Sequence, residues 1–319
     1  MKILVSGIKP TGELHLGNYL GAIKNWVSLQ NSGQYKCFFF IADFHALTID
    51  IKPEDLRRQS FNLAVDLLSL GIDPKESIFF RQSDVIGHTE LGWIFDCLIP
   101  VAELERMTQF KDMSQRSPNN TNAGLLTYPP LQAADVLLYN GEFVPIGEDQ
   151  VQHLELSRII ARKFNNRYQK HFPEMKPVLS PTPRVMSLNQ SDKKMSKSLG
   201  ASSYIALRDD EQTITAKIKK AVTDEQGVKN LLELYSYFGD PDQHQAMIEL
   251  FQQGKLMNVD LKKKLTEVIT EFLRPIRTRR HEFEKNPKKI NKILADGAAA
   301  AQKIADKNLG QIKKIIGLN

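Results

Sequence analysis

The first 200 residues alternate short apolar runs with longer amphipathic segments, and this alternation constrains the fold more than any other feature of the sequence. Apolar runs at residues 3–6, 37–42, 77–81 and 143–146 have the length of buried strands, and segments with helical spacing lie between and after them. Strands joined by helices run parallel, because the chain has to cross a face of the sheet before the next strand begins. The sequence therefore predicts an α/β fold with a doubly wound, Rossmann-type parallel sheet.

The second half of the chain has a different pattern. Beyond residue 203 the sequence is rich in Lys, Glu, Ala and Leu, with helical spacing and breaks at residues 239–241, 286–287 and Gly297. We expect an α/β domain over residues 1–200 with an inserted connecting region, and a C-terminal all-helical domain over residues 201–290. A last helix over residues 291–319 can pack back on the first domain.

Two details of the first domain also follow from the sequence. The stretch 114–124 is rich in Ser, Asn and Thr, which predicts a mobile loop. Pro129 and Pro130 suit the first turn of a helix, and we expect one from Pro129 to Leu138.

Charge is distributed unevenly along the chain. The net charge is +6, but residues 255–319 hold 16 Lys and Arg against 7 Asp and Glu, so this segment carries +9 and the remainder −3. This asymmetry is expected of a protein that binds a polyanion such as a nucleic acid. A solvated helical surface would give a similar count, so both interpretations stay open at this point.

Cysteine content and hydropathy exclude several classes of protein. Cys37 and Cys97 are too few for a disulfide framework or a four-cysteine metal site, and their apolar neighbours indicate two buried thiols. No segment approaches the roughly 18 apolar residues of a membrane-spanning helix, and the first residues lack the features of a targeting peptide. We expect a cytoplasmic protein without a membrane partner.

Two segments near the N-terminus predict a phosphate-binding loop. Residues 6–12 follow the first expected strand, and His15-Leu16-Gly17-Asn18 begins the next helix, where free N–H groups and a partial positive charge favour anions. Gly7 and Gly17 would let the backbone approach a nucleotide closely. His15 and Asn18 can each donate a hydrogen bond to phosphate. Taken alone, the pattern is also that of an ordinary strand-to-helix turn with polar caps.

A second motif, far downstream, strengthens the first. Lys193-Lys194-Met195-Ser196-Lys197-Ser198 places lysines three residues apart among small hydroxyl side chains. The ammonium groups of such a loop can close over a triphosphate. Together the two motifs predict phosphoryl chemistry, in which positioning and electrostatic stabilisation supply most of the rate.

The segment from Thr127 to Asp135 indicates the class of the second substrate. Tyr128, Gln132 and Asp135 are spaced four and three residues apart, which places them on one face of an otherwise apolar helix. A buried carboxylate such as Asp135 needs a donor, and a substrate with one N–H or O–H on an aromatic ring would supply it. Such a site rejects phenylalanine by roughly 10⁴ to 10⁵.

These motifs resemble the signatures of class I aminoacyl-tRNA synthetases, and the similarity to the bacterial tryptophanyl type covers essentially the whole chain. Segments 103–111, 147–150 and 185–188 add to it. The resemblance implies that L-tryptophan attacks ATP, assisted by Mg²⁺, to give tryptophanyl adenylate and pyrophosphate, and that the tryptophanyl group then passes to tRNA(Trp) with release of AMP. It also implies anticodon binding by residues 201–290, a homodimer, and no structural metal held by the protein.

The resemblance further assigns roles residue by residue. The expected catalytic residues are His15, Asn18, Lys111, Lys194 and Lys197. The residues expected to bind ATP are Lys9, Pro10, Thr11, Gly17, Asn18, Gly147, Glu148, Asp149, Val185, Lys194, Met195, Ser196, Lys197 and Ser198. The residues expected to bind tryptophan are Val5, Gly7, His45, Gln109, Tyr128, Gln132, Asp135 and Gln150.

Two positions depart from the family pattern, and two alternatives remain. Lys9 stands where many relatives have Gln, and Val5 where several have Phe. Lys9 can form a charge-assisted bond with phosphate or extend into solvent. Tyrosyl-tRNA synthetases share the Q-x-x-D element, although Val5 offers nothing to a substrate hydroxyl. A class I-like nucleotidyltransferase would share the loop around His15 but would lack the tRNA-binding helices.

Overall fold

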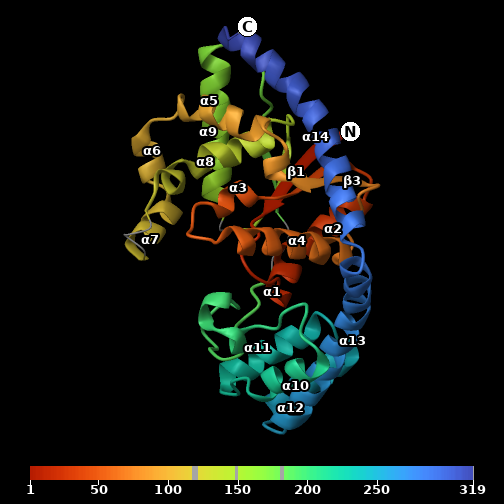
Figure 1. Ribbon diagram of the computed structural model, residues 1–319. Coiled ribbons are helices and arrows are strands. Elements are labelled where there is room, and N and C mark those ends of the chain that lie inside the picture. The colour runs from red at the N-terminus through yellow and green to blue at the C-terminus, as the bar shows by residue number, and fades with distance from the viewer. Residues whose placement is uncertain (117–120, 148–149, 180–182, 319) are drawn as a thin grey trace. The chain divides into compact units, whose positions relative to one another are not determined.

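The computed structural model describes residues 1–116, 121–147, 150–179 and 183–318. The chain divides into two compact units (Figure 1). Unit 1 comprises Met1–Thr11, Asn25–Pro181 and Asn286–Asn319, and unit 2 comprises Gly12–Lys24 and Thr182–Lys285. The chain therefore enters unit 2 directly after its first strand, returns to unit 1, and enters unit 2 again near residue 183.

Unit 1 is built on five parallel strands in the order β3-β2-β1-β4-β5. The strands are β1 (Lys2–Ile8), β2 (Tyr35–Ile41), β3 (Ser77–Arg81), β4 (Phe143–Ile146) and β5 (Lys176–Leu179). β1 pairs with β2 along its whole length and with β4 at Leu4 opposite Phe143. The strand order reverses at β1, which confirms the predicted doubly wound fold. In such folds ligands bind beyond the carboxyl ends of the strands at this reversal.

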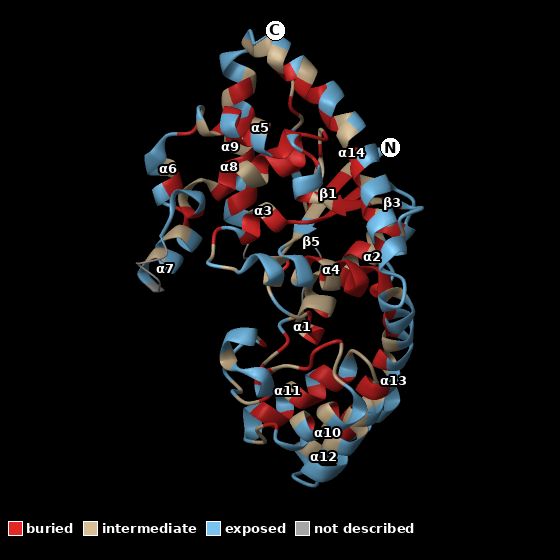
Figure 2. Ribbon diagram, in the orientation of Figure 1, coloured by how far each residue is buried: buried red, intermediate tan, exposed pale blue. Residues whose placement is uncertain are grey.

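Helices cover both faces of the sheet. Successive side chains of a strand point to opposite faces, and residues 37–41 of β2 are all buried. Figure 2 shows the interior of unit 1 mainly in red, the colour of buried residues. The helical elements of unit 1 are α2 (Lys24–Asn31), α3 (Asp43–Ala46), α4 (Pro53–Leu70), the 3₁₀ turn η2 (Gln82–Asp84), α5 (Gly87–Asp96), α6 (Val101–Glu105), α7 (Thr108–Arg116), α8 (Ala123–Leu137), α9 (Val151–Arg167) and α14 (Pro287–Ile316).

Helix α8 begins earlier than the sequence predicts. Asn122 is its N-cap, and its side-chain oxygen accepts the N–H of Leu125 at 2.9 Å. Pro129 and Pro130 therefore lie inside the helix, although each removes one backbone donor. Both prolines are buried, and α8 packs against α5 and α9. Tertiary packing thus outweighs the local preference on which the expected start at Pro129 was based.

Gly297 is also wrong as an expected helix break, because it lies in the middle of α14. A Cβ atom at Gly297 would be 1.9 Å from the carbonyl oxygen of Phe79 in β3. The glycine therefore lets the helix backbone lie directly against the strand. The buried residues of α14 recur at helical spacing from Ile290 to Ile312, so one face of this helix belongs to the core of unit 1.

Unit 2 is mainly helical. Its elements are α1 (Leu16–Asn18), the π-helical turn η1 (Tyr19–Ile23), the 3₁₀ turns η5 (Lys197–Leu199) and η6 (Ala201–Ser203), α10 (Glu211–Lys219), α11 (Glu225–Ser236), α12 (Pro241–Gln252) and α13 (Asn258–Glu284). The N-caps of α10, α11 and α12 are Asp210, Asp224 and Asp240, each accepting a backbone N–H. Helices α10 and α11 pack their apolar faces on α13.

The two thiols differ in exposure. Cys37 in β2 is buried, but Cys97 is exposed, so the expectation of two buried thiols is wrong for Cys97. Cys97 is the C-cap of α5 and lies off the stripe formed by Leu91, Ile94 and Phe95, which faces the core. Over the residues that the structure describes, no helix is both long enough and apolar enough to cross a membrane.

Gly297→Ala should lower the free energy of unfolding by about 1–3 kcal/mol, because the added methyl group would overlap the Phe79 carbonyl and displace α14 from β3. Gly310→Ala is the matched control on the same helix, since the space around its Cβ position is open. We expect that change to raise stability by about 0.5–1 kcal/mol. Urea unfolding measures both, and similar effects for the two variants would contradict the close contact.

Candidate functional site

Asp135 on α8 is the centre of a buried hydrogen-bond network in unit 1. Its Oδ1 accepts from Nε2 of Gln82 at 2.6 Å and from Nδ1 of His88 at 2.7 Å. Its Oδ2 accepts from Nε2 of His45 at 2.7 Å. All four side chains are buried. The donors lie on α3, η2 and α5, the segments that follow β2 and β3, so the network forms at the carboxyl edge of the sheet.

The network keeps the Asp135 carboxyl ionised. Burial alone would raise its pKa, but the positive charge and hydrogen bond of His45 and the hydrogen bond of His88 outweigh that effect and hold the pKa below its usual value. A carboxylate can accept about four hydrogen bonds, two on each oxygen. Described residues fill three of these positions, and none of the described residues donates to the fourth, on Oδ2.

The sequence predicted His45 and Asp135 but missed Gln82 and His88. Gln82 directly follows β3, and this position at the carboxyl edge of the sheet is the signal that could have found it. Its amide is oriented by a second bond, since its Oε1 accepts the N–H of Phe44 at 3.1 Å. His88 lies in the first turn of α5, and nothing in its sequence neighbourhood marks it.

A second cluster surrounds Tyr128. The Tyr128 hydroxyl lies 2.8 Å from Oε1 of Gln109 and 2.5 Å from Nε2 of His153. Nζ of Lys9 lies 5.4 Å from the centre of the Tyr128 ring, and the His45 ring lies 6.2 Å from it. Burial raises the pKa of Tyr128. The structure therefore brings four predicted residues together and adds His153, which the sequence reasoning missed.

Other predicted residues of unit 1 have simpler surroundings. Val5 is buried in the core of the sheet. Gly7 is exposed, and a Cβ atom there would lie 2.4 Å from the Phe40 ring, so only glycine fits at this position. Pro10 is buried, Thr11, Gln132, Gly147 and Gln150 are half-buried, and Lys111 on α7 is exposed. Glu148 and Asp149 lie outside the described residues.

His15 begins a second group of predicted residues, which lies in unit 2. Its Nδ1 accepts the N–H of Asn18 at 3.3 Å, and the Asn18 side-chain oxygen accepts the N–H of His15 at 3.1 Å. Burial, helped by the charges of Lys197 and Lys194, lowers the pKa of His15 to about 4. His15 is therefore neutral at neutral pH, and because Nδ1 accepts, its proton lies on Nε2. The free Nε2–H can donate to an anion.

The lysine-containing motif at residues 193–198 also lies in unit 2, close to His15. A Cβ atom at Gly12, where φ is +81°, would lie 3.3 Å from Nζ of Lys197, so this side chain extends across the glycine. Met195 is buried, and its N–H donates to the carbonyl of Val185 at 2.9 Å. Gly17 makes room for His15, since a Cβ atom would lie 3.0 Å from the imidazole.

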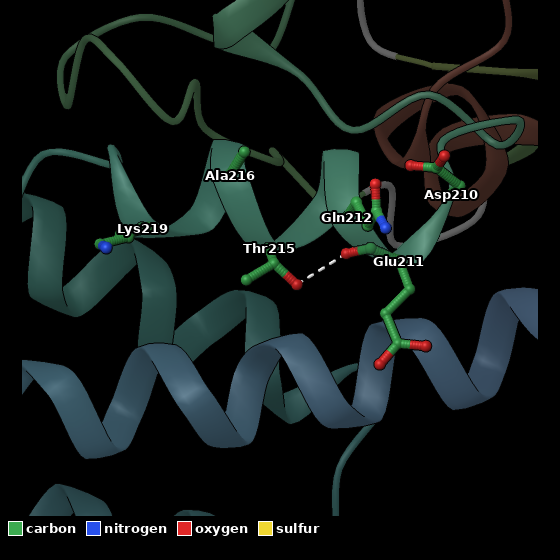
Figure 3. Close-up of a pocket in the computed structure, with 6 residues that line it drawn as sticks. All are labelled: Asp210, Glu211, Gln212, Thr215, Ala216 and Lys219. Carbon is green, nitrogen blue, oxygen red and sulfur yellow. Dashed lines mark hydrogen bonds between the residues drawn. The ribbon is translucent and has the colours of Figure 1, made fainter.

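Another hollow of unit 2 lies along α10. Figure 3 shows it, lined by Asp210, Glu211, Gln212, Thr215, Ala216 and Lys219. These side chains carry charges of both signs, and none of them belongs to the residues that the sequence motifs single out. Within the described ranges, no group of three or more His, Cys, Asp or Glu side chains is arranged to hold a metal ion.

Residues 1–274 match the family described as tRNA synthetases class I (W and Y). The chain is 43% identical to the tryptophan–tRNA ligase of Wolinella succinogenes, with 99% of each chain covered. It is 42% identical to the tryptophan–tRNA ligase of Bacillus anthracis, which covers 100% of this chain and 99% of that one. The similarity therefore extends over the full length of these relatives.

Solved structures give the same result. The tryptophanyl-tRNA synthetase of Campylobacter jejuni, solved in complex with ADP and tryptophan, has a TM-score of 0.87 and 33% identity and covers 99% of this chain. The enzyme of Mycoplasma pneumoniae has a TM-score of 0.84 and 32% identity. The tyrosyl-tRNA synthetase of Archaeoglobus fulgidus, at 20% identity and a TM-score of 0.69, shares the fold.

The pKa of His15 is expected near 4 in a pH titration followed by NMR of its imidazole. Lys197→Met removes a positive charge that disfavours the imidazolium, so the pKa should rise toward, but not reach, the usual value of about 6.5, because burial remains the larger cause. An unchanged pKa in Lys197→Met would contradict the proximity of this ammonium group to His15.

Proposed function

This chain belongs to the class I tRNA synthetases for tryptophan and tyrosine, and we propose that it is a tryptophan–tRNA ligase, which activates L-tryptophan with ATP and transfers it to tRNA(Trp). The observation that carries the choice of substrate is the buried, ionised Asp135 with one acceptor position left on Oδ2. The indole N–H of tryptophan supplies the donor that this position requires. Phenylalanine would leave a buried charge short of a donor, which costs roughly 10⁴ to 10⁵ in discrimination.

The other residues of the tryptophan side bind the rest of the amino acid. Tyr128 and Gln150 hold the amino and carboxylate groups in our assignment. The cluster of Tyr128 with Gln109 and His153 supports it, because these contacts fix the position of the Tyr128 hydroxyl. The remaining residues assigned to this side are Val5, Gly7, His45, Gln109 and Gln132.

The phosphate side supplies donors to the reacting groups. A carboxylate oxygen of tryptophan attacks the α-phosphorus of ATP, the bond from this phosphorus to the bridging oxygen breaks, and its electron pair leaves with pyrophosphate. The Nε2–H of neutral His15 and the side-chain amide of Asn18 donate to the phosphate oxygens. Lys194, Lys197 and Lys111 stabilise the negative charge of the leaving group. The products are tryptophanyl adenylate and pyrophosphate.

Further residues are assigned to the nucleotide, and Mg²⁺ to its phosphates. Gly147, Glu148, Asp149 and Val185 bind ribose and adenine in this proposal, and Lys9, Pro10, Thr11, Gly17, Met195, Ser196 and Ser198 complete the ATP site. Mg²⁺ would neutralise phosphate charge. It is usually held by substrate phosphates and one or two carboxylates, so it needs no cage of protein ligands.

The second step requires tRNA. The adenylate is attacked by the hydroxyl of the terminal ribose of tRNA(Trp), which releases AMP and leaves the tryptophanyl ester. We assign residues 1–200 to catalysis, residues 201–290 to the anticodon, and residues 291–319 to a helix that supports the catalytic part. The charge of +9 on residues 255–319 supports contact with a polyanion. A cytoplasmic location follows from this substrate.

The enzyme is a homodimer in this proposal, and one apolar face of unit 1 supports it. Trp93 on α5 and Leu47 after α3 are 70% and 56% exposed, and both border a cavity of about 260 Å³ between α3, α5 and α8. Large apolar side chains gathered at one exposed place indicate a protein contact.

Wild-type protein should catalyse ATP–pyrophosphate exchange with tryptophan and not with tyrosine. Asp135→Ala should lower kcat/KM for tryptophan by at least about 10²-fold, since it removes the acceptor of the indole N–H and leaves three buried donors without their partner. Exchange with tyrosine would transfer the assignment to the tyrosyl type. Exchange with neither amino acid would favour a nucleotidyltransferase.

Trp93→Glu should convert the dimer into a monomer in sedimentation experiments, because a buried charge without a partner would destabilise the interface. Val259→Glu is the control, since Val259 is 73% exposed and belongs to α13 of unit 2 and not to the proposed face of unit 1. A Trp93→Glu variant that remains a dimer would place the interface elsewhere.

A further inference from the structure

A buried tyrosine extends the Asp135 network by one residue. Oη of Tyr139 lies 2.7 Å from Nε2 of His88, whose Nδ1 lies 2.7 Å from Oδ1 of Asp135. The exposed fractions of Tyr139, His88 and Asp135 are 1%, 0% and 2%. Water therefore cannot replace any member, and the three groups have to satisfy one another.

The positions of the protons follow from this requirement. Burial and the nearby charge of Asp135 raise the pKa of Tyr139, so its hydroxyl keeps its proton and donates. Asp135 is ionised and can only accept. His88 must then carry its proton on Nδ1 and accept the Tyr139 hydroxyl at Nε2, which pairs both ring nitrogens. Asp135 thus fixes the tautomer of His88, and Tyr139 holds the ring in place by donating to Nε2.

Aromatic side chains hold the hydrogen-bonded residues Tyr139 and His88 in place. The His88 ring lies 5.7 Å from the centre of the Phe40 ring and 6.0 Å from that of Phe80. The Tyr139 ring stacks on Phe38 at 4.6 Å. These contacts leave His88 little freedom to turn away from Asp135.

We propose that His88 is a positioning residue for the recognition of the aromatic donor, and that Tyr139 acts through it by donating to Nε2 and so holding the ring toward Asp135. The inference rests on the proposed function. Gln82 and His88 fill both acceptor positions of Oδ1, so the carboxylate keeps its charge and cannot rotate. The one position that it offers to a substrate is on Oδ2. His88 thus determines where the N–H of tryptophan has to lie without touching tryptophan.

Loss of His88 should therefore change selectivity more than the fold. Without its N–H, Oδ1 gains an open position, the carboxyl group can turn or bind a proton, and the pKa of Asp135 rises. A substrate without an N–H then binds beside a carboxyl group that can turn or bind a proton, so the missing hydrogen bond to Asp135 costs less. The penalty against such a substrate becomes smaller.

The test compares tryptophan with an analogue in which sulfur replaces the indole N–H, using kcat/KM for ATP–pyrophosphate exchange. His88→Leu combined with Tyr139→Phe removes the donor without leaving an unpaired hydroxyl, so this variant is expected to fold. The preference for tryptophan should fall about ten- to a hundredfold, through KM more than kcat. His88→Asn, whose side-chain N–H can take the place of Nδ1–H, should keep most of the preference.

Two further variants separate positioning from structural support. Tyr139→Phe alone should lower the preference about two- to tenfold. Tyr235→Phe, at a buried tyrosine of unit 2, should leave it unchanged. A folded double variant with the wild-type preference would overturn the inference and leave the proposed function intact. Wild-type protein without tryptophan-dependent exchange would overturn both.

Nitrogen-15 NMR of the His88 imidazole gives a readout independent of activity. We expect a protonated Nδ1 and an unprotonated Nε2 in both proteins, and a changed nitrogen-15 shift of Nε2 in Tyr139→Phe, where this nitrogen loses its donor. An unchanged Nε2 shift in the variant would overturn the role assigned to Tyr139.

Discussion

The buried charge of Asp135 is the constraint on which the arrangement of the site depends. A carboxylate removed from water costs several kcal/mol unless hydrogen-bond donors compensate for it. The donors to Asp135 come from α3, η2 and α5, which follow β2 and β3, whereas the carboxylate comes from α8. These four segments can meet only if the parallel sheet brings the carboxyl ends of its strands to one edge. The order and register of the strands therefore set the position of a single charge.

The residues around His15, which we predict to bind phosphate, use burial and hydrogen bonds to the opposite effect. There the protein has to offer a donor in a place where two lysines already carry positive charge. Burial and these lysines keep His15 neutral, and the backbone N–H of Asn18 occupies Nδ1, so that the one proton of the ring lies on Nε2. A protonated His15 would add a third charge and lose its contact with Asn18. At Asp135 hydrogen bonds preserve a charge, whereas at His15 they fix the place of a proton.

The sequence predicted what local spacing encodes and failed where distant residues decide. The parallel sheet, the loop at His15 and the face of α8 with Tyr128 and Asp135 follow from periodicity within one segment. Gln82 and His88 were missed because their partner lies 53 and 47 residues away. Pro129 and Gly297 were misinterpreted for the same reason. Pro129 lies in a helix packed on two others, and Gly297 lies against the carbonyl of Phe79, which is far from it in the sequence.

The choice between tryptophan and tyrosine cannot reside in Asp135 alone, since a carboxylate accepts an N–H and an O–H equally well. The difference lies in what the substrate needs in return. An indole N–H only donates, but a phenol also carries lone pairs that lose their water on binding and need a donor. Val5 of β1 has no side-chain donor. The N–H groups of Gln82, His45 and His88 that face Asp135 already donate to its carboxylate. The Asp135 site therefore favours a ligand that donates to the carboxylate and needs no hydrogen-bond donor from the protein in return.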